Sequence, residues 1–437
     1  MSRRLSPRVA ALVVAALPGL AWACALPVPD GPYPVGHQRF ELADPSRRGV
    51  SGEAPDAVRT LPAIAWYPAA RAGAPRPYLA PEDARVQLPA LARNLRYAVD
   101  DTLAIGACTA AGAGTGVASR PARGFPLVVF SHGFFSYPAQ NTALAESLAS
   151  HGYVVVALGH PGDAADVALA DGRVVPTYMA PESPALLDWR QRFHAADDHD
   201  TRAALIDGYA QALAGSRLGA SQATWRDDVL FAVRALQAGE VPAAFAPVLA
   251  AADPRRLAIA GMSFGGSTAA TACHRLPTCR AAVSLDGLNF DPALYDADLA
   301  RPLLALTSDW VRFPLYDGTP SDPGFHHNDY AYERWTRAGL APDVIRVRVP
   351  GTRHMAFSDL PLLMGGTARE ANFGDADFAA TARGIAAVTR AFLDRHLDDA
   401  PAAGVDAAIE AAGFARHDPA QTRDWARSRN RAVQPGG

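Results

Sequence analysis

The middle of the chain alternates short apolar runs with longer stretches in which apolar positions recur at helical spacing. The runs are continuous and rich in β-branched residues, as buried parallel strands are. They cover 127–130, 153–158, 257–260, 281–285, 303–307 and 344–349. On the last long helical stretch, Phe378, Ile385, Val388 and Phe392 fall on one face. This alternation predicts an α/β fold with a mostly parallel central sheet and helices on both faces.

Other stretches depart from this rhythm. Residues 38–42 and 63–67 fit two antiparallel edge strands. Residues from about 161 to 222 are polar and separate a strand from the next helix by far more than the usual few residues, which predicts an inserted cap. The composition of 400–437 predicts a weakly packed helix and a frayed tail. We expect residues 24–437 to form a single domain.

The first 23 residues have the pattern of a secretory signal peptide. Arginines precede an apolar run over 9–20, and Ala21-Trp22-Ala23 puts small residues where a signal peptidase reads them. The run is too short to span about 30 Å of hydrocarbon as a helix, which disfavours a membrane anchor. Cleavage after Ala23 would leave Cys24 first, so a lipid anchor on Cys24 is a weaker alternative. We expect a secreted or periplasmic protein.

Export would place the four cysteines in an oxidising compartment. Cys273 and Cys279 lie at the end of a predicted helix and just before a predicted strand. Their α-carbons can therefore approach within the roughly 4.4–6.8 Å that a disulfide needs, and we expect them to pair. A disulfide between Cys24 and Cys108 follows only by elimination, and buried free thiols are the alternative.

The composition excludes several chemistries. All 41 residues counted as Lys or Arg are arginine, so the chain has no lysine. Lysine Schiff bases, a pyridoxal phosphate anchor, a P-loop and the kinase lysine are thereby excluded. The 44 acidic residues leave a net charge of −3, so no overall basic field attracts nucleic acid or an anionic bilayer. We expect no nucleic-acid partner and no stable membrane insertion.

A candidate nucleophile lies between a predicted strand and a predicted helix. Gly261-Met262-Ser263-Phe264-Gly265 follows the strand that ends at Ala260 and opens a helix. In this context the G-x-S-x-G pattern marks a nucleophilic serine, because its glycines permit a sharp turn without side-chain collision. The helix N-terminus also points free amides toward the serine.

A nucleophilic serine needs a base and a residue that orients the base. In this type of fold they follow in the order Ser, acid, His, each just after a strand. Asp286 ends the strand over 281–285, and His354 lies five residues after Val349. Each alone could be a turn former or a solvated loop residue, but their order and positions favour a triad with Ser263. Such a triad needs no cofactor.

A further loop supplies the expected oxyanion hole. Ser131-His132-Gly133-Phe134 directly follows a strand, and the amides of Phe134 and Phe264 are predicted to stabilise a tetrahedral oxyanion. We expect His132 to pack beneath this hole. His160, at the end of the next strand, has two alternatives: a structural loop residue, which we favour, and a candidate substrate contact.

A metal site is the main rival chemistry. Two groups of ligand-type residues could supply one, but neither has the spacing of a known metal motif. Both groups lie in polar stretches, so we expect solvated surfaces and no metal. The groups are His194, Asp197, Asp198, His199 and Asp200, and His326, His327 and Asp329.

Five segments of the chain together form a recognisable pattern. They are Val128-Val129-Phe130-Ser131-His132-Gly133, Leu148-Ala149-Ser150-His151-Gly152-Tyr153-Val154-Val155, Gly261-Met262-Ser263-Phe264-Gly265-Gly266, Ser284-Leu285-Asp286 and His354-Met355-Ala356-Phe357-Ser358-Asp359.

With these segments the chain resembles the platelet-activating factor acetylhydrolase family of the α/β-hydrolases. The resemblance runs from about Pro34 to His396 and implies an α/β-hydrolase fold with Ser263 as nucleophile, Asp286 as acid and His354 as base. Met262 stands where many members have His, and Gly287 where an aromatic residue follows the acid, so the family's substrate is not carried over.

The sequence therefore predicts a secreted serine ester hydrolase that forms an acyl-enzyme on Ser263 and acts on short-acyl or lipid-like esters. One alternative is a cutinase-like or feruloyl-type esterase, which differs in its substrate profile. Another is a serine peptidase on the same fold, which would cleave amides faster than esters. A binding protein that merely keeps the fold would not react with a fluorophosphonate.

Overall fold

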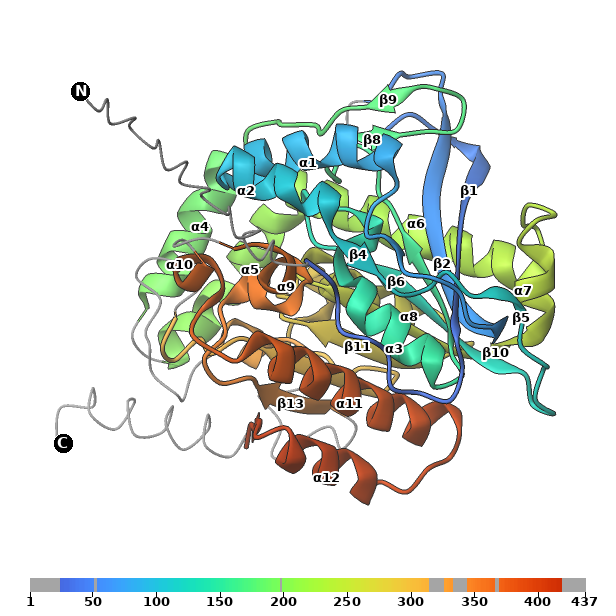
Figure 1. Ribbon diagram of the computed structural model, residues 1–437. Helices are drawn as coiled ribbons and strands as arrows, with labels where there is room; N and C mark the ends of the chain where they lie inside the picture. The colour runs from blue at the N-terminus through green and yellow to red at the C-terminus, as the bar shows by residue number, and fades with distance from the viewer. Residues whose placement is uncertain are drawn as a thin grey trace, which may run out of the picture.

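The structure, a computed structural model, describes residues 24–50, 53–196, 199–313, 326–332, 344–365 and 369–418. The predicted signal peptide lies outside these residues. A ten-stranded sheet forms the centre of the fold (Figure 1). In spatial order its strands are β1 (Val35–Arg48), β2 (Val58–Arg71), β7 (Val154–Leu158), β6 (Phe125–Ser131), β10 (Ala252–Met262), β11 (Cys279–Leu285), β12 (Leu303–Thr307), β13 (Val344–Arg348) and β14 (Ala415–Arg416), with β5 (Thr115–Val117) paired to β2.

The strands from β7 to β13 in this order are parallel, while β1, β2 and β14 pair antiparallel with their neighbours. The predicted mostly parallel sheet is thus confirmed. Of the two predicted edge strands only β1 lies at the edge, because β2 also pairs with β7. Two small ribbons lie outside the sheet: β3 (Arg76–Pro77) with β4 (Thr109–Ala110), and β8 (Val167–Ala168) with β9 (Val174–Val175).

Helices cover both faces of the sheet (Figure 1). Alternate side chains of β6 point to opposite layers. Val128 and Phe130 join a core with α3 (Thr142–Ser150) and α11 (Phe378–Leu397). Leu127 and Val129 join a second core with α6 (Arg217–Ala238) and α8 (Phe264–Arg275). Burial on both faces explains why the strands read as continuous apolar runs.

The other described helices lie in the connections between these elements. They are α1 (Pro81–Leu95), α2 (Val99–Ala104), α4 (Pro184–Ala195), α5 (His199–Ala214), α7 (Ala246–Ala251), α9 (Leu360–Leu363), α10 (Arg369–Phe373) and α12 (Ala403–Ala411), with the 3-10 turns η1 (Ile105–Ala107), η2 (Pro138–Asn141), η3 (Pro292–Leu294), η4 (His327–Tyr330) and η5 (His354–Phe357). The stretch predicted as a cap, 161–222, contains β8, β9, α4, α5 and the start of α6.

The segment after Ala400 packs more closely than its composition suggests. Val405 and Ile409 of α12 are buried in the core that includes α11. β14 then extends the sheet beside β13. Two apolar side chains on one helix face suffice to dock this helix, although its remaining residues are small or charged. The rest of the predicted tail, 419–437, lies outside the described residues.

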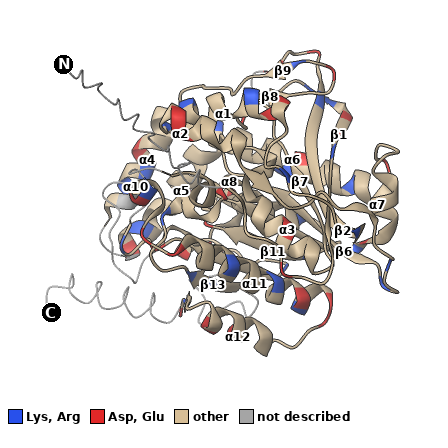
Figure 2. Ribbon diagram, viewed as in Figure 1, with Lys and Arg blue, Asp and Glu red and all other residues tan. Residues whose placement is uncertain are grey.

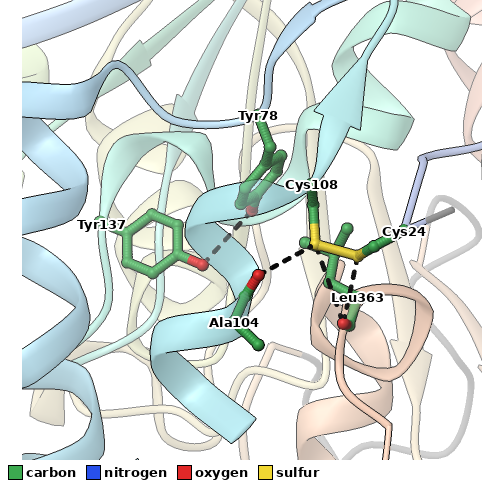
Figure 3. The surroundings of a disulfide bond; sticks show 6 residues. All are labelled: Cys24, Tyr78, Ala104, Cys108, Tyr137 and Leu363. Carbon is green, nitrogen blue, oxygen red and sulfur yellow. Dashed lines mark hydrogen bonds between the residues drawn. A yellow bond between two sulfur atoms is a disulfide. The ribbon is translucent and has the colours of Figure 1, made fainter. Parts of the chain in front are cut away.

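The predicted Cys273–Cys279 disulfide is present. Cys24 and Cys108, which the sequence paired only by elimination, also form a disulfide. The Cys24 Sγ lies 3.3 Å from the carbonyl oxygen of Leu363, in the helix that follows the His354 segment (Figure 3). Because the Cys24 sulfur is bonded to Cys108, it cannot at the same time carry a thioether-linked lipid. The structure therefore argues against a lipid anchor at this residue.

The two disulfides close loops of very different length, 84 and 6 residues. In the chain-entropy account the longer loop restricts the unfolded chain more, so we expect the Cys24→Ser/Cys108→Ser variant to lose about 4.5 kcal/mol of unfolding free energy. The same account gives about 2 kcal/mol for Cys273→Ser/Cys279→Ser. Urea unfolding of both variants beside the wild type measures the difference; equal losses would contradict the loop-length argument.

Arginine and acidic residues are interspersed along the helices and strands (Figure 2). Among the residues that the structure describes, none of the helices combines the length and the apolar character that a membrane crossing requires.

Candidate active site

Ser263 lies at the sharp turn between β10 and α8. Its backbone has φ 56° and ψ −121°, a conformation that L-residues rarely adopt and that often occurs at functional sites. The flanking glycines are sterically required. A β-carbon on Gly261 would lie 2.2 Å from the carbonyl oxygen of Gly265, and one on Gly265 would lie 2.1 Å from the carbonyl oxygen of Ser131. The predicted turn is therefore formed by the residues that the pattern singled out.

Asp286 follows β11, also with a positive φ of 51°. Its amide donates to the carbonyl oxygen of Leu306 at 2.6 Å, and the Ser308 amide donates to its Oδ1 at 2.6 Å. Burial of the side chain disfavours the charged form. Hydrogen bonds from His354 and the Ser308 amide, with the attraction of His354, outweigh it and hold the pKa of Asp286 below its ordinary value. The carboxylate is thus fixed and ionised.

His354 connects the other two residues. It begins η5, and its side chain is about one quarter exposed. The His354 Nδ1 lies 2.7 Å from Asp286 Oδ2, and Nε2 lies 2.8 Å from Ser263 Oγ. A carboxylate only accepts, so Nδ1 carries the proton and Nε2 is free to accept from the serine hydroxyl. The structure brings together all three residues that the sequence proposed as a triad.

The predicted oxyanion loop approaches the serine closely. A β-carbon on Gly133 would lie 3.3 Å from Ser263 Cβ, so a larger residue there would crowd the serine. The Phe264 amide is at the first position of α8, where no intrahelical acceptor exists. Beyond the Phe134 amide the loop is anchored, since the Phe135 amide donates to the carbonyl oxygen of Asp163 at 2.8 Å. Phe264 directly follows Ser263, and Gly133, the residue before Phe134, lies against it, so the amides of Phe134 and Phe264 stay the predicted oxyanion donors.

The structure does not place His160 as a substrate contact. Its side chain is fully buried, with Nδ1 2.9 Å from Asp228 Oδ2 and Nε2 3.1 Å from Ser131 Oγ. The ring also stacks on Trp225, with the ring centroids 3.9 Å apart. Both nitrogens and one face are therefore occupied by protein groups. The structural alternative describes this residue better.

The second group of metal-type residues is buried, where the sequence predicted a solvated surface. Asp329 forms an ion pair with Arg346 and accepts the amide of His326 at 2.6 Å. His326 Nδ1 in turn accepts the amide of Asn328 at 3.1 Å. These polar groups hold a turn together beneath the surface, which their polarity alone did not indicate. His327 is buried in the same turn.

The first group of metal-type residues lies mostly outside the described part of the chain. Asp197, Asp198 and the side chains of His194 and His199 lie outside the described residues, and Asp200 is exposed on α5. In the described part of the chain, no cluster of three or more histidine, cysteine or acidic side chains is arranged to hold a metal ion.

Two residues that support the site were missed by the sequence analysis. Gln140 Oε1 accepts the amide of Gly133 at 2.7 Å and so holds the oxyanion loop. Asn328 accepts the amide of Asn289 at 2.9 Å and donates to the carbonyl oxygen of Gly287 at 2.8 Å, which fixes the chain just after Asp286. Neither residue belongs to a local motif, so only the folded contacts reveal them.

Comparison with solved structures identifies the fold. The ferulic acid esterase from Streptomyces cinnamoneus is similar with a TM-score of 0.62 and 23% sequence identity, over 92% of this chain and 98% of that chain. The chain has the α/β-hydrolase fold. At this identity the likeness establishes the α/β-hydrolase architecture, and it confirms the fold that the sequence predicted.

A sequence model of the family described as platelet-activating factor acetylhydrolase, isoform II, matches residues 27–172. The predicted resemblance is confirmed over this part of the α/β-hydrolase fold. The matched region includes the oxyanion loop but ends before Ser263, Asp286 and His354. Curated protein sequences give no match.

Proposed function

We propose that this protein is a serine hydrolase of carboxylic esters that works through an acyl-enzyme on Ser263. The observation that carries the proposal is the continuous hydrogen-bonded chain from Asp286 through His354 to Ser263. Ser263 is half-buried, so its hydroxyl is not sealed in the core. A nucleophile hydrogen-bonded to a base, and a base held by a third group, is the geometry that acyl transfer requires.

Each group has a defined task in this proposal. His354 Nε2 takes the proton of Ser263 as Oγ attacks the ester carbonyl, and Asp286 stabilises the imidazolium that forms. The amides of Phe134 and Phe264 donate to the oxyanion of the tetrahedral intermediate. His354 then protonates the departing alkoxide. Water then attacks the acyl-enzyme with His354 as the base. His354 returns the proton to Ser263 Oγ as the acid is released.

The cap, residues 161–222, is proposed to shape the substrate pocket. The Arg217 guanidinium lies over the rings of Phe134 and Phe135, 4.9 and 5.7 Å from their centroids. The same guanidinium donates to Asp163 Oδ1 at 3.1 Å. The stretch therefore reaches the oxyanion loop directly, where it can contact the acyl or alcohol part of an ester.

Short-acyl or lipid-like esters are the proposed substrates, in keeping with the family match. Esters of ferulic acid are a second candidate, favoured by the likeness to a ferulic acid esterase over nearly the whole chain. The two disulfides support export, because such bonds persist in oxidising compartments.

The test is fluorophosphonate labelling followed by a substrate panel. We expect one equivalent of label on Ser263, located by peptide mass spectrometry, and hydrolysis of p-nitrophenyl esters that depends on acyl length. A phospholipid with a short second acyl chain, methyl ferulate and a peptide p-nitroanilide complete the panel. Faster cleavage of the anilide would replace the esterase by a peptidase, and absence of both labelling and turnover would refute the proposal.

A further inference from the structure

One peptide group beside the active site is held from its carbonyl end. The carbonyl oxygen of Gly133 accepts two hydrogen bonds, one from His132 Nδ1 at 2.7 Å and one from the Ser136 amide at 3.1 Å. A trans peptide is planar, with its C=O and N–H pointing in opposite directions. The N–H of this peptide belongs to Phe134 and is the proposed oxyanion donor. Hydrogen bonds to the carbonyl therefore fix the direction of the Phe134 N–H.

The neighbouring groups determine which His132 nitrogen carries the proton. A carbonyl oxygen only accepts, so Nδ1 must donate to Gly133. The other nitrogen, Nε2, faces the backbone N–H of His160 at 3.3 Å and must accept. Both requirements are met by the neutral ring with its proton on Nδ1. Burial, with the nearby His160, lowers the pKa of His132 to about 3, although the hydrogen bond to Gly133 opposes this shift.

His160 is itself held by a buried ion pair. Its Nδ1 lies 2.9 Å from Asp228 Oδ2, and that carboxylate receives two hydrogen bonds from Arg59, at 2.7 and 3.2 Å. The side chains of His160, Asp228 and Arg59 are all fully buried. Because Ser131 Oγ lies 3.1 Å from His160 Nε2, this is a second Ser-His-Asp arrangement in the chain. Ser131 is also fully buried, so it does not face a substrate.

We propose that His132 is a positioning residue that aims the Phe134 amide at the oxyanion, and that the His160, Asp228 and Arg59 chain fixes His132 in turn. The proposal rests on the proposed function, since it concerns the oxyanion hole of that reaction. His132 would therefore do more than pack beneath the loop. Its hydrogen bond to Gly133 would contribute to stabilising the transition state.

Two substitutions at His132 distinguish a positioning role, which needs the hydrogen bond to Gly133, from a role in packing alone. Leucine fills much of the volume without a donor, whereas asparagine can place an amide N–H near the position of Nδ1. We expect His132→Leu to lower kcat by about 10- to 100-fold, less than the loss of an oxyanion donor itself. KM for a p-nitrophenyl ester should stay within about twofold, because the oxyanion forms only in the transition state. His132→Asn should recover most of the lost kcat.

Val129→Ala is the matched control. Val129 is fully buried on β6, the strand that leads into His132, and packs in the layer with α6 and α8, so its truncation perturbs the core without touching the loop. We expect this variant to unfold at lower urea concentration but to keep the wild-type kcat. Unchanged kcat in His132→Leu, or equal losses in the leucine and asparagine variants, would overturn the proposal.

A measurement on the wild type covers the case in which His132→Leu does not fold. Nitrogen-15 NMR of histidine-labelled protein should show His132 as the neutral ring protonated on Nδ1; a proton on Nε2 would overturn the proposal. The two hypotheses fail separately. A wild type without ester turnover or labelling of Ser263 refutes the proposed function, whereas an active wild type with insensitive His132 variants refutes only the positioning role.

Discussion

Replacing Ser263 with alanine is expected to lower kcat for a short p-nitrophenyl ester by about 10⁴- to 10⁶-fold. The substitution removes the oxygen that would form the acyl bond. In the wild type this oxygen lies 2.8 Å from His354 Nε2, so without it His354 has no nucleophile to activate. The remaining amides of the oxyanion hole can still assist a direct attack by water. Steady-state kinetics together with the loss of fluorophosphonate incorporation measure the effect.

The same variant should remain folded. Alanine and serine share the cost of the positive φ at this position, so the strained turn is equally unfavourable in both. The urea midpoint should therefore change little. Turnover within tenfold of the wild type in a folded, contaminant-free Ser263→Ala preparation would assign the nucleophile elsewhere.

Asp286→Asn is expected to reduce kcat by about 10⁴-fold by trapping His354 in the wrong tautomer. The Ser308 amide donates to Asp286 Oδ1, so an asparagine would keep its oxygen there and turn its NH₂ group toward His354. The Nδ1 of His354 would then have to accept a hydrogen bond, which moves the ring proton to Nε2. A protonated Nε2 cannot take the proton of Ser263.

Asp44→Asn is a suitable control for this variant. Asp44 is also a buried, hydrogen-bonded aspartate, but it lies on β1 and contacts Ser46 and Arg47. We expect Asp44→Asn to affect stability alone, with kcat unchanged. Wild-type kcat in Asp286→Asn would exclude the proposed orienting role.

The stability contribution of Asp286 has a defined direction with pH. The folded-state pKa is below the ordinary value, so the contribution is fully present above the unfolded-state pKa. It disappears as the pH falls through the folded-state pKa. The difference in urea midpoint between the wild type and Asp286→Asn should accordingly narrow on acidification.

The local sequence was sufficient to predict those elements in which burial or backbone geometry restricts the type of residue. The strands were predictable because burial on both faces demands continuous apolar runs, and the turn at Ser263 because only glycine fits at Gly261 and Gly265. The order of Asp286 and His354 followed from the strands that precede them. In each case a local pattern marks the residue, even where the contact that requires it is distant, as between Gly265 and Ser131.

What the local sequence left open or predicted wrongly depended on distant partners. His160, for which the sequence allowed a structural role or a substrate contact, is buried because Asp228 and Arg59, far away in the sequence, meet it inside the core. Asp329 is buried because Arg346 pairs with it. Polarity indicates exposure only when no such partner is present, and the sequence does not show which charged residues will meet.

The Cys24–Cys108 bond also bears on how the protein should be produced. Because Cys24 lies against the carbonyl oxygen of Leu363, the cross-link ties the amino-terminal segment to the helix just beyond His354. Synthesis in a reducing bacterial cytosol would leave this connection unmade. The specific activity of such a preparation would then depend on the fraction of molecules that carry the disulfide as well as on the rate of the reaction. Periplasmic expression, or refolding in a glutathione buffer, would give material in which mutant and wild-type rates can be compared.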